Sequence, residues 1–191
     1  MDETLSLTAD RTLIRAGGAS KRYLLADVDV PLRAGDHPRL PINVALVIDR
    51  SGSMRGAKIG YACDAARYAL GLLTAADRVA VVAFDDRIEV PVPSTRRDPP
   101  AFAAAREAIA HLDARGTTDL AAGWLTGCRE IATHLEAGTI ARCLVLTDGL
   151  ANRGTTDPDV LVRHATELRA RGIVTSTFGI GNDFDEVLLG A

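Results

Sequence analysis

The segment from Asp49 to Ser53 places three oxygen donors on alternate residues. Asp49, Ser51 and Ser53 follow the apolar run 44–48, which is typical of a fully buried strand. Side chains two residues apart point the same way in an extended segment, so we expect one carboxylate and two hydroxyls to converge. Such hard oxygen donors suit a hard divalent cation such as Mg²⁺. The spacing favours a metal site at the end of a strand, where open α/β sheets bind ligands.

Strand and helix patterns alternate along the chain from residue 42 onward, which is typical of an α/β layer fold. Apolar runs predict buried strands over 44–48, 78–84 and 142–147, and a last strand is predicted over 173–178. Helical spacing and cap residues predict helices over 57–73, 100–112, 119–135, 157–171 and from 183 onward. A tight turn at 85–87 predicts a hairpin strand over 88–92, and its two prolines place that strand at an edge.

The order of these elements brings distant polar residues to one edge of the predicted sheet. Helical crossovers make the strands 44–48, 78–84 and 142–147 parallel, so their carboxyl ends share that edge. The hairpin strand runs back, and the helix after it delivers the loop 116–118 to the same edge. The site residues that we predict there are Asp49, Ser51, Ser53, Thr118 and Asp148. The fold that we predict is a doubly wound, Rossmann-like α/β fold with a mostly parallel sheet, one antiparallel edge strand and helices on both faces.

The first part of the chain has a different pattern. Leu5, Leu7, Thr12 and Ile14, followed by the segment 23–30, predict short strands. We expect turns between them at 15–18 and after them at 33–37. The predicted organisation is an N-terminal β extension over 1–40 and a main domain over 41–191.

Composition excludes several classes of protein. The 191 residues are 47% hydrophobic and 25% charged, which is typical of a folded domain. A net charge of −3 gives no basic footprint for nucleic acid. No apolar run reaches the length of a membrane helix, and residues 1–4 show no signal peptide, so we expect a cytoplasmic location. The three cysteines, Cys63, Cys128 and Cys143, form no disulfide pattern and are expected to be buried thiols.

Three segments together resemble the von Willebrand factor type A (vWA) domain, in its bacterial type. The family's metal-ion-dependent adhesion site (MIDAS) has a D-x-S-x-S strand exit, a Thr after a Gly-rich loop, and an Asp after the fourth strand. The matching segments here are 49–53, 116–120 and 146–149, and the resemblance spans about residues 42–189. The family often has two glycines before its Thr, whereas this chain has Gly116 and Thr117, which leaves Thr117 as an alternative ligand.

The resemblance implies a role for each site residue. Ser51 and Ser53 would coordinate the metal directly, and Thr118 would do so directly or through water. Asp49 and Asp148 would act largely through waters or hydrogen bonds. Neutral hydroxyls leave the charge of Mg²⁺ (or Mn²⁺ or Ca²⁺) poorly neutralised, so an Asp or Glu of a protein partner would complete the octahedron. The expected function is a non-enzymatic, metal-dependent protein-protein interaction. The partner and the oligomeric state are left open.

The resemblance also bears on the end of the domain. The family usually carries a sixth strand after its last helix, whereas this chain stops at Ala191, inside that predicted helix. We therefore leave open whether the C-terminal end of the domain is truncated.

Two other functions remain as alternatives. A Mg²⁺-dependent phosphatase of the haloacid dehalogenase type needs a second Asp where this chain has Ser51, and a catalytic Lys where Lys58 lies in a helix. A structural domain with a vestigial metal site is the other alternative. A nucleotide-binding protein is disfavoured because the chain has no G-x-x-x-x-G-K-[ST] segment.

Several polar residues flank the predicted site. Asp119 is expected to cap the helix that follows it, or else to support the metal. The pair 85–86 is expected to form a solvated hairpin turn. Arg50 and Met54 are expected to shape the partner surface, as is the pair 152–153, for which a plain surface loop is the alternative.

Overall fold

The computed structural model describes residues 4–11, 17, 21, 23–29, 39–96 and 98–190. The chain forms two compact units, Met1–Arg39 and Leu40–Ala191. Thr12, Ile14 and the predicted turn at 33–37 lie outside the described residues, as does the turn at 15–18 apart from Gly17. The assignment of separate domains over 1–40 and 41–191 stays a prediction.

The first unit contains a two-stranded antiparallel sheet of β1 (Thr4–Ala9) and β2 (Leu24–Asp29). Leu5 lies opposite Val28, and Leu7 lies opposite Ala26. These are the short N-terminal strands that the alternating pattern predicts.

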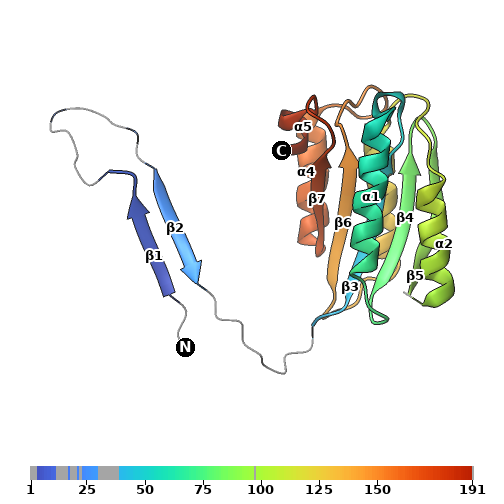
Figure 1. The fold of residues 1–191 in the computed structure, drawn as a ribbon, viewed down its shortest axis with the longest axis horizontal. Helices are drawn as coiled ribbons and strands as arrows, with labels where there is room; N and C mark the ends of the chain where they lie inside the picture. Colours follow the sequence, from blue (N-terminus) through green and yellow to red (C-terminus); the bar gives the residue numbers. More distant parts are fainter. Residues whose placement is uncertain are drawn as a thin grey trace. The chain divides into compact units, whose positions relative to one another are not determined.

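The second unit is built on a five-stranded sheet with the order β5-β4-β3-β6-β7 (Figure 1). Its strands are β3 (Ile42–Asp49), β4 (Arg78–Phe84), β5 (Ile88–Arg96), β6 (Ile140–Thr147) and β7 (Ile173–Gly179). The strands β4, β3, β6 and β7 are parallel, and β5 runs antiparallel to β4 at the edge. The predicted doubly wound, mostly parallel sheet with one antiparallel edge strand is confirmed.

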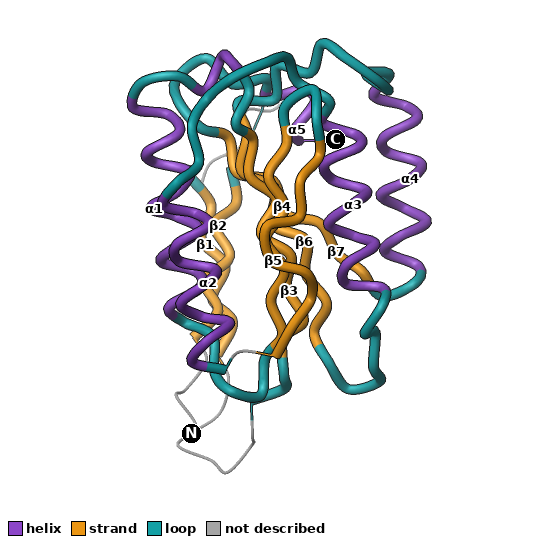
Figure 2. The backbone as a smooth tube through the Cα atoms, turned by 90° about the vertical axis from the view of Figure 1, so that its right-hand side faces the viewer, coloured by secondary structure: helices purple, strands orange, loops and turns teal. Residues whose placement is uncertain are grey.

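Helices cover both faces of this sheet (Figure 2). The helical elements are the short 3₁₀ helix η1 (Gly52–Met54), α1 (Ala57–Gly71), α2 (Pro99–Ala110), α3 (Leu120–Ala132), α4 (Pro158–Ala170) and α5 (Glu186–Gly190). On one face Leu46 and Ile48 of β3 pack with α1 and α2, and on the other Val47 packs with α3. Successive residues of β3 therefore pack into two separate cores, because side chains alternate across a strand. This explains why the strand is apolar at every residue over 44–48.

Helix boundaries follow the predicted ones with small shifts. The predicted helix from residue 183 begins only at Glu186, and the strand predicted over 88–92 continues to Arg96. The side chain of Asp119 accepts a hydrogen bond from the Ala122 N–H at 3.0 Å, so its predicted capping role is confirmed.

Among the described residues no helix combines the length and apolar character needed to cross a bilayer.

The three cysteines are free and buried, as the sequence predicts.

Candidate functional site

Three buried aspartates stand at the carboxyl edge of the sheet, one at the end of each of three neighbouring strands. Asp49 is the last residue of β3, Asp85 follows β4, and Asp148 follows β6. The parallel register aligns Ile48 with both Ala83 and Leu146, so the strands end level with one another. Each of these aspartates is 0% exposed. The aspartates are therefore held at the edge where the sequence predicts the site.

Asp49 joins the exits of β3 and β6. Its Oδ1 accepts a hydrogen bond from the Ser51 backbone N–H at 2.8 Å, and its Oδ2 accepts one from the Thr147 hydroxyl. Burial raises the pKa of Asp49, and these hydrogen bonds offset only part of that rise. The carboxylate thus fixes the turn that carries the two serines.

The two serine hydroxyls lie against each other and against the carboxylate of Asp148. The Oγ atoms of Ser51 and Ser53 are 3.0 Å apart, and Ser53 Oγ donates to Asp148 Oδ1 at 3.2 Å. Two adjacent ligands of an octahedral Mg²⁺, each about 2.0–2.1 Å from the ion, are separated by about 2.9 Å. The structure brings these oxygens to almost that spacing, so the donor set fits a small hard cation.

Thr118 reaches the same edge on the loop before α3. The Gly52 N–H donates to the Gly116 carbonyl at 3.0 Å, and a Cβ at Gly52 would lie 3.1 Å from that oxygen, so the close approach favours glycine. Thr118 is buried, and its backbone N–H donates to Asn152 Oδ1 at 2.9 Å. Its hydroxyl makes no hydrogen bond with any residue in the described part of the chain. Thr117 is exposed, which favours Thr118 as the donor.

A lysine that the sequence analysis did not assign to the site lies beside Asp148. The ammonium nitrogen of Lys58, in the first turn of α1, is 3.1 Å from Asp148 Oδ2 and 2.7 Å from Asp183 Oδ1. The hydrogen bond with Asp183 raises the pKa of Lys58 and lowers that of Asp183. Its position nine residues after Asp49, in the first turn of the predicted helix over 57–73, is the sequence signal that could have identified it.

Three expectations about the flanking residues are wrong. Asp85 is fully buried rather than solvated, and its Oδ2 lies 3.2 Å from Arg50 Nε and 2.8 Å from Arg115 Nε. Arg50 is 5% exposed and Met54 is 0% exposed, so neither lies on a partner surface. Arg50 is buried because its guanidinium group pairs with the buried carboxylate of Asp85. Met54 is buried because η1 turns its side chain into the core beneath α1.

The arginines decide the ionisation of Asp85. Burial by itself would raise the pKa of Asp85, but the hydrogen bonds from Arg115 and from the Arg87 backbone, with the charge of Arg50, lower it overall. Arg50 and Arg115 also contact Glu89 at 2.6 and 2.7 Å. The exposed pair Asp86 and Arg153 is looser, at 3.8 Å.

A metal at this edge would depend on hydroxyl ligands. Across the ranges that the structure describes, no group of three or more His, Cys, Asp and Glu side chains is placed to hold a metal ion. Beside the hydroxyls of two loops, the edge instead has the buried carboxylates of Asp49 and Asp148. This set of donors suits Mg²⁺ or Mn²⁺ better than a soft metal, because every donor is oxygen.

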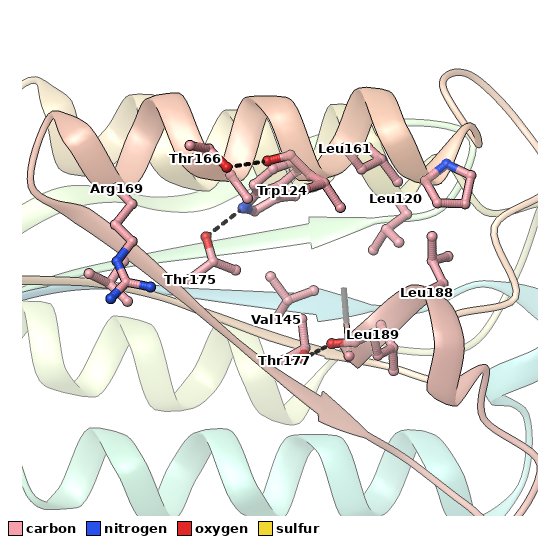
Figure 3. Close-up of a pocket in the computed structure, with 15 residues that line it drawn as sticks. Leu120, Trp124, Val145, Leu161, Thr166, Arg169, Thr175, Thr177, Leu188 and Leu189 are labelled. Carbon is pink, nitrogen blue, oxygen red and sulfur yellow. Dashed lines mark hydrogen bonds between the residues drawn. The ribbon is translucent and has the colours of Figure 1, made fainter.

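A separate hollow of about 340 Å³ lies between α4, β7 and α5 (Figure 3). Its lining is mostly apolar, and several of the polar groups in it form hydrogen bonds with one another. Trp124 Nε1 donates to Thr175 Oγ1 at 2.9 Å, and Thr177 Oγ1 donates to the Leu189 carbonyl at 2.7 Å. None of the five predicted site residues lines it. The hollow and the carboxyl edge are therefore distinct features.

The match to a family model agrees with this architecture. The model described as the von Willebrand factor type A domain matches residues 44–150, which include all five predicted site residues. The chain therefore belongs to the von Willebrand factor type A domain family.

The relatives that match this chain are longer proteins. The uncharacterized protein sll0103 of Synechocystis is 32% identical over 187 residues, which cover 97% of this chain and 43% of that protein. The chain spans less than half the length of the curated relatives it matches. Among solved structures, a von Willebrand factor type A protein from Catenulispora acidiphila superposes with a TM-score of 0.66 at 29% identity, covering 78% of this chain and 35% of that one.

A more distant neighbour shares the fold and is described with a metal. Proximal thread matrix protein 1 of the mussel byssus superposes with a TM-score of 0.61 at 18% identity, covering 79% of this chain and 40% of that one. That structure has a zinc-occupied MIDAS motif. A divalent metal therefore occupies a MIDAS motif in one protein of this fold.

Proposed function

We propose that this chain binds a protein partner through a divalent metal ion at the carboxyl edge of its sheet. The residues that would hold the ion are Asp49, Ser51, Ser53, Thr118 and Asp148, and the ion would be Mg²⁺, Mn²⁺ or Ca²⁺. The observation that carries the proposal is the chain of oxygens from Ser51 through Ser53 to Asp148, with separations of 3.0 and 3.2 Å. The family and the zinc-occupied neighbour support it.

The donor set accounts for the kind of partner. Three of the five donors are neutral hydroxyls, so a bound cation would keep much of its charge and supply an open position for an anionic oxygen. An Asp or Glu side chain of the partner has the charge and the oxygen that such a position attracts. Ser53 is the exposed member of the set and marks the side from which that carboxylate would enter.

Ser51 and Lys58 argue against hydrolysis as the function. Ser51 stands where a phosphatase of the haloacid dehalogenase type needs its second Asp, and Lys58 is already engaged with two carboxylates. We therefore propose a binding role without catalysis. The cytoplasmic location stays a prediction.

Calorimetric titration with Mg²⁺ and with Mn²⁺ tests the metal site. We expect the wild-type protein to bind one ion, and Ser53→Ala and Thr118→Ala to lose that binding. Thr117→Ala, which removes the neighbouring exposed hydroxyl, is the matched control and should bind as the wild type does. Loss of binding in Thr117→Ala together with its retention in Thr118→Ala would reject the ligand assignment.

A pair of tripeptides tests the carboxylate; each has an acetylated N-terminus and an amidated C-terminus, so that the Glu side chain carries the only carboxylate. With Mn²⁺ bound, the relaxation rate of water protons reports how many waters the ion holds. Gly-Glu-Gly should displace water and lower that rate, whereas Gly-Gln-Gly should leave it unchanged. Equal effects of the two peptides would contradict the proposed mode of partner binding.

A further inference from the structure

Lys58 places an ammonium group against a carboxylate of the proposed metal site. Its Nζ lies 3.1 Å from Asp148 Oδ2, while the other oxygen of that carboxylate accepts the hydrogen bond from Ser53. The carboxylate is therefore shared between a permanent cation on one side and the hydroxyl cluster on the other. Asp148 is 0% exposed, so water does little to screen this interaction.

The surrounding chain holds Lys58 in this position. Its side chain is only 19% exposed, and its Nζ also contacts Asp183 at 2.7 Å. A Cβ at Gly181 would lie 2.7 Å from Lys58 Cε, so the absence of a side chain there makes room for the lysine. The loop that carries Gly181 and Asp183 is fastened to the site by the Asp185 N–H, which donates to the Asp148 carbonyl at 3.0 Å.

We propose that Lys58 determines how the site divides its affinity between the metal and the partner's carboxylate. This inference rests on the proposed function. Asp49 and Asp148 carry two negative charges beside the hydroxyls, and the ammonium of Lys58 carries one positive charge, which the exposed carboxylate of Asp183 shares. Removal of Lys58 therefore makes the site one unit more negative, whether or not a divalent ion is bound. Lys58 therefore weakens binding of the metal by repulsion and strengthens binding of an incoming carboxylate by attraction.

A purely structural role for Lys58 predicts a different result. If the lysine only held Asp148 in the orientation that suits the metal, its removal would weaken metal binding and carboxylate binding together. The charge role predicts changes of opposite sign. Measuring both affinities in the same variant therefore separates the two roles.

The test compares the wild-type protein with Lys58→Met, Lys58→Arg and Arg55→Met. Mn²⁺ affinity is measured by calorimetry, and affinity of the Mn²⁺-loaded protein for Gly-Glu-Gly by water-proton relaxation. Lys58→Met should bind Mn²⁺ about ten-fold more tightly and Gly-Glu-Gly about ten-fold more weakly. Lys58→Arg keeps the charge and should stay near the wild type in both. Arg55→Met removes the same charge from an exposed residue of the adjoining loop, and screening should limit its effect to about two-fold.

The possible outcomes distinguish failure of this inference from failure of the proposed function on which it rests. Failure of the wild-type protein to bind Mn²⁺ overturns the proposed function and this inference with it. If the wild-type protein binds Mn²⁺ and Lys58→Met binds Mn²⁺ equally tightly or more weakly, the inference alone is overturned. Equal changes in Lys58→Met and Arg55→Met also overturn it, because the effect would then come from overall charge. Thermal unfolding of each variant shows that the comparison is made between folded proteins.

Discussion

Asp85 and Asp148 occupy equivalent places in the fold and have different surroundings. Each follows a parallel strand, each lies at the carboxyl edge, and each is 0% exposed. Asp85 is neutralised by Arg50 and Arg115, whose guanidinium groups lie 3.2 and 2.8 Å away. Asp148 meets a serine hydroxyl and one lysine. Position in the sheet is therefore insufficient to make a carboxylate a metal ligand, because the groups that neutralise it decide its role.

The kind of cation explains the difference. An arginine fork is rigid and permanently charged, and two of them leave a carboxylate little capacity to attract another cation. Asp148 meets one ammonium, which Asp183 shares, and a hydroxyl that adds no charge, so more of its negative charge remains available to an ion. The edge thus contains a structural carboxylate beside β4 and a candidate binding carboxylate beside β6. The predictions below test this division, from the largest expected effect to the smallest.

Asp85→Ala should lower the free energy of unfolding by about 3 kcal/mol, because it removes the buried partner of Arg50, which is 5% exposed. Asp86→Ala, at the next residue, removes an exposed carboxylate and should change stability by less than about 0.5 kcal/mol. Urea-induced unfolding of both variants measures the difference. Similar losses in the two variants would show that Asp85 is no more structural than its exposed neighbour.

Saturation with Mn²⁺ should stabilise the wild-type protein, since the proposed site is formed in the folded protein and not in the unfolded chain. At about 100 times the dissociation constant the gain is about 2.7 kcal/mol. Asp148→Asn should show no gain, whereas Asp86→Ala should show the full gain. Unfolding midpoints with and without the ion measure this, and a full gain in Asp148→Asn would remove Asp148 from the site.

Thr147→Val should cost about 2 kcal/mol, because the Thr147 hydroxyl donates to the buried carboxylate of Asp49 and accepts the Gly149 N–H. Thr175→Val removes a hydroxyl that accepts a neutral hydrogen bond from Trp124, and should cost about half as much. Denaturant unfolding of both proteins gives the comparison. A larger loss at Thr175 would mean that the charge on Asp49 adds little to its hydrogen bond.

The stability that Asp85 contributes should disappear in acid. Its pKa is lower in the folded protein than in the unfolded chain, so its contribution is complete above the unfolded pKa and falls as the pH drops through the folded pKa. The difference in unfolding free energy between the wild type and Asp85→Asn should therefore shrink between about pH 5 and pH 2. Unfolding curves across that range measure it. A difference that is constant across this range would contradict the ion-pair role of Asp85.

Much of the fold could be predicted from the sequence because its signals are local. The apolar run before Asp49, the prolines of β5 and the cap at Asp119 each report on their own element. Strand directions then placed Asp148 and the loop of Thr118 at the same edge as the serines. The predictions for Asp85, Arg50 and Met54 failed because each treated a polar or flanking residue as solvated from its neighbours in sequence alone.

The sequence by itself determined the alternation of strands and helices and the spacing of the oxygen donors, since both are periodic features of short segments. Only the tertiary structure decided which charge meets which carboxylate. Arg115 reaches Asp85 across 30 residues, and Lys58 reaches Asp148 across 90. Burial then gives these pairings their strength, because a low-dielectric interior makes each charge depend on its immediate partner.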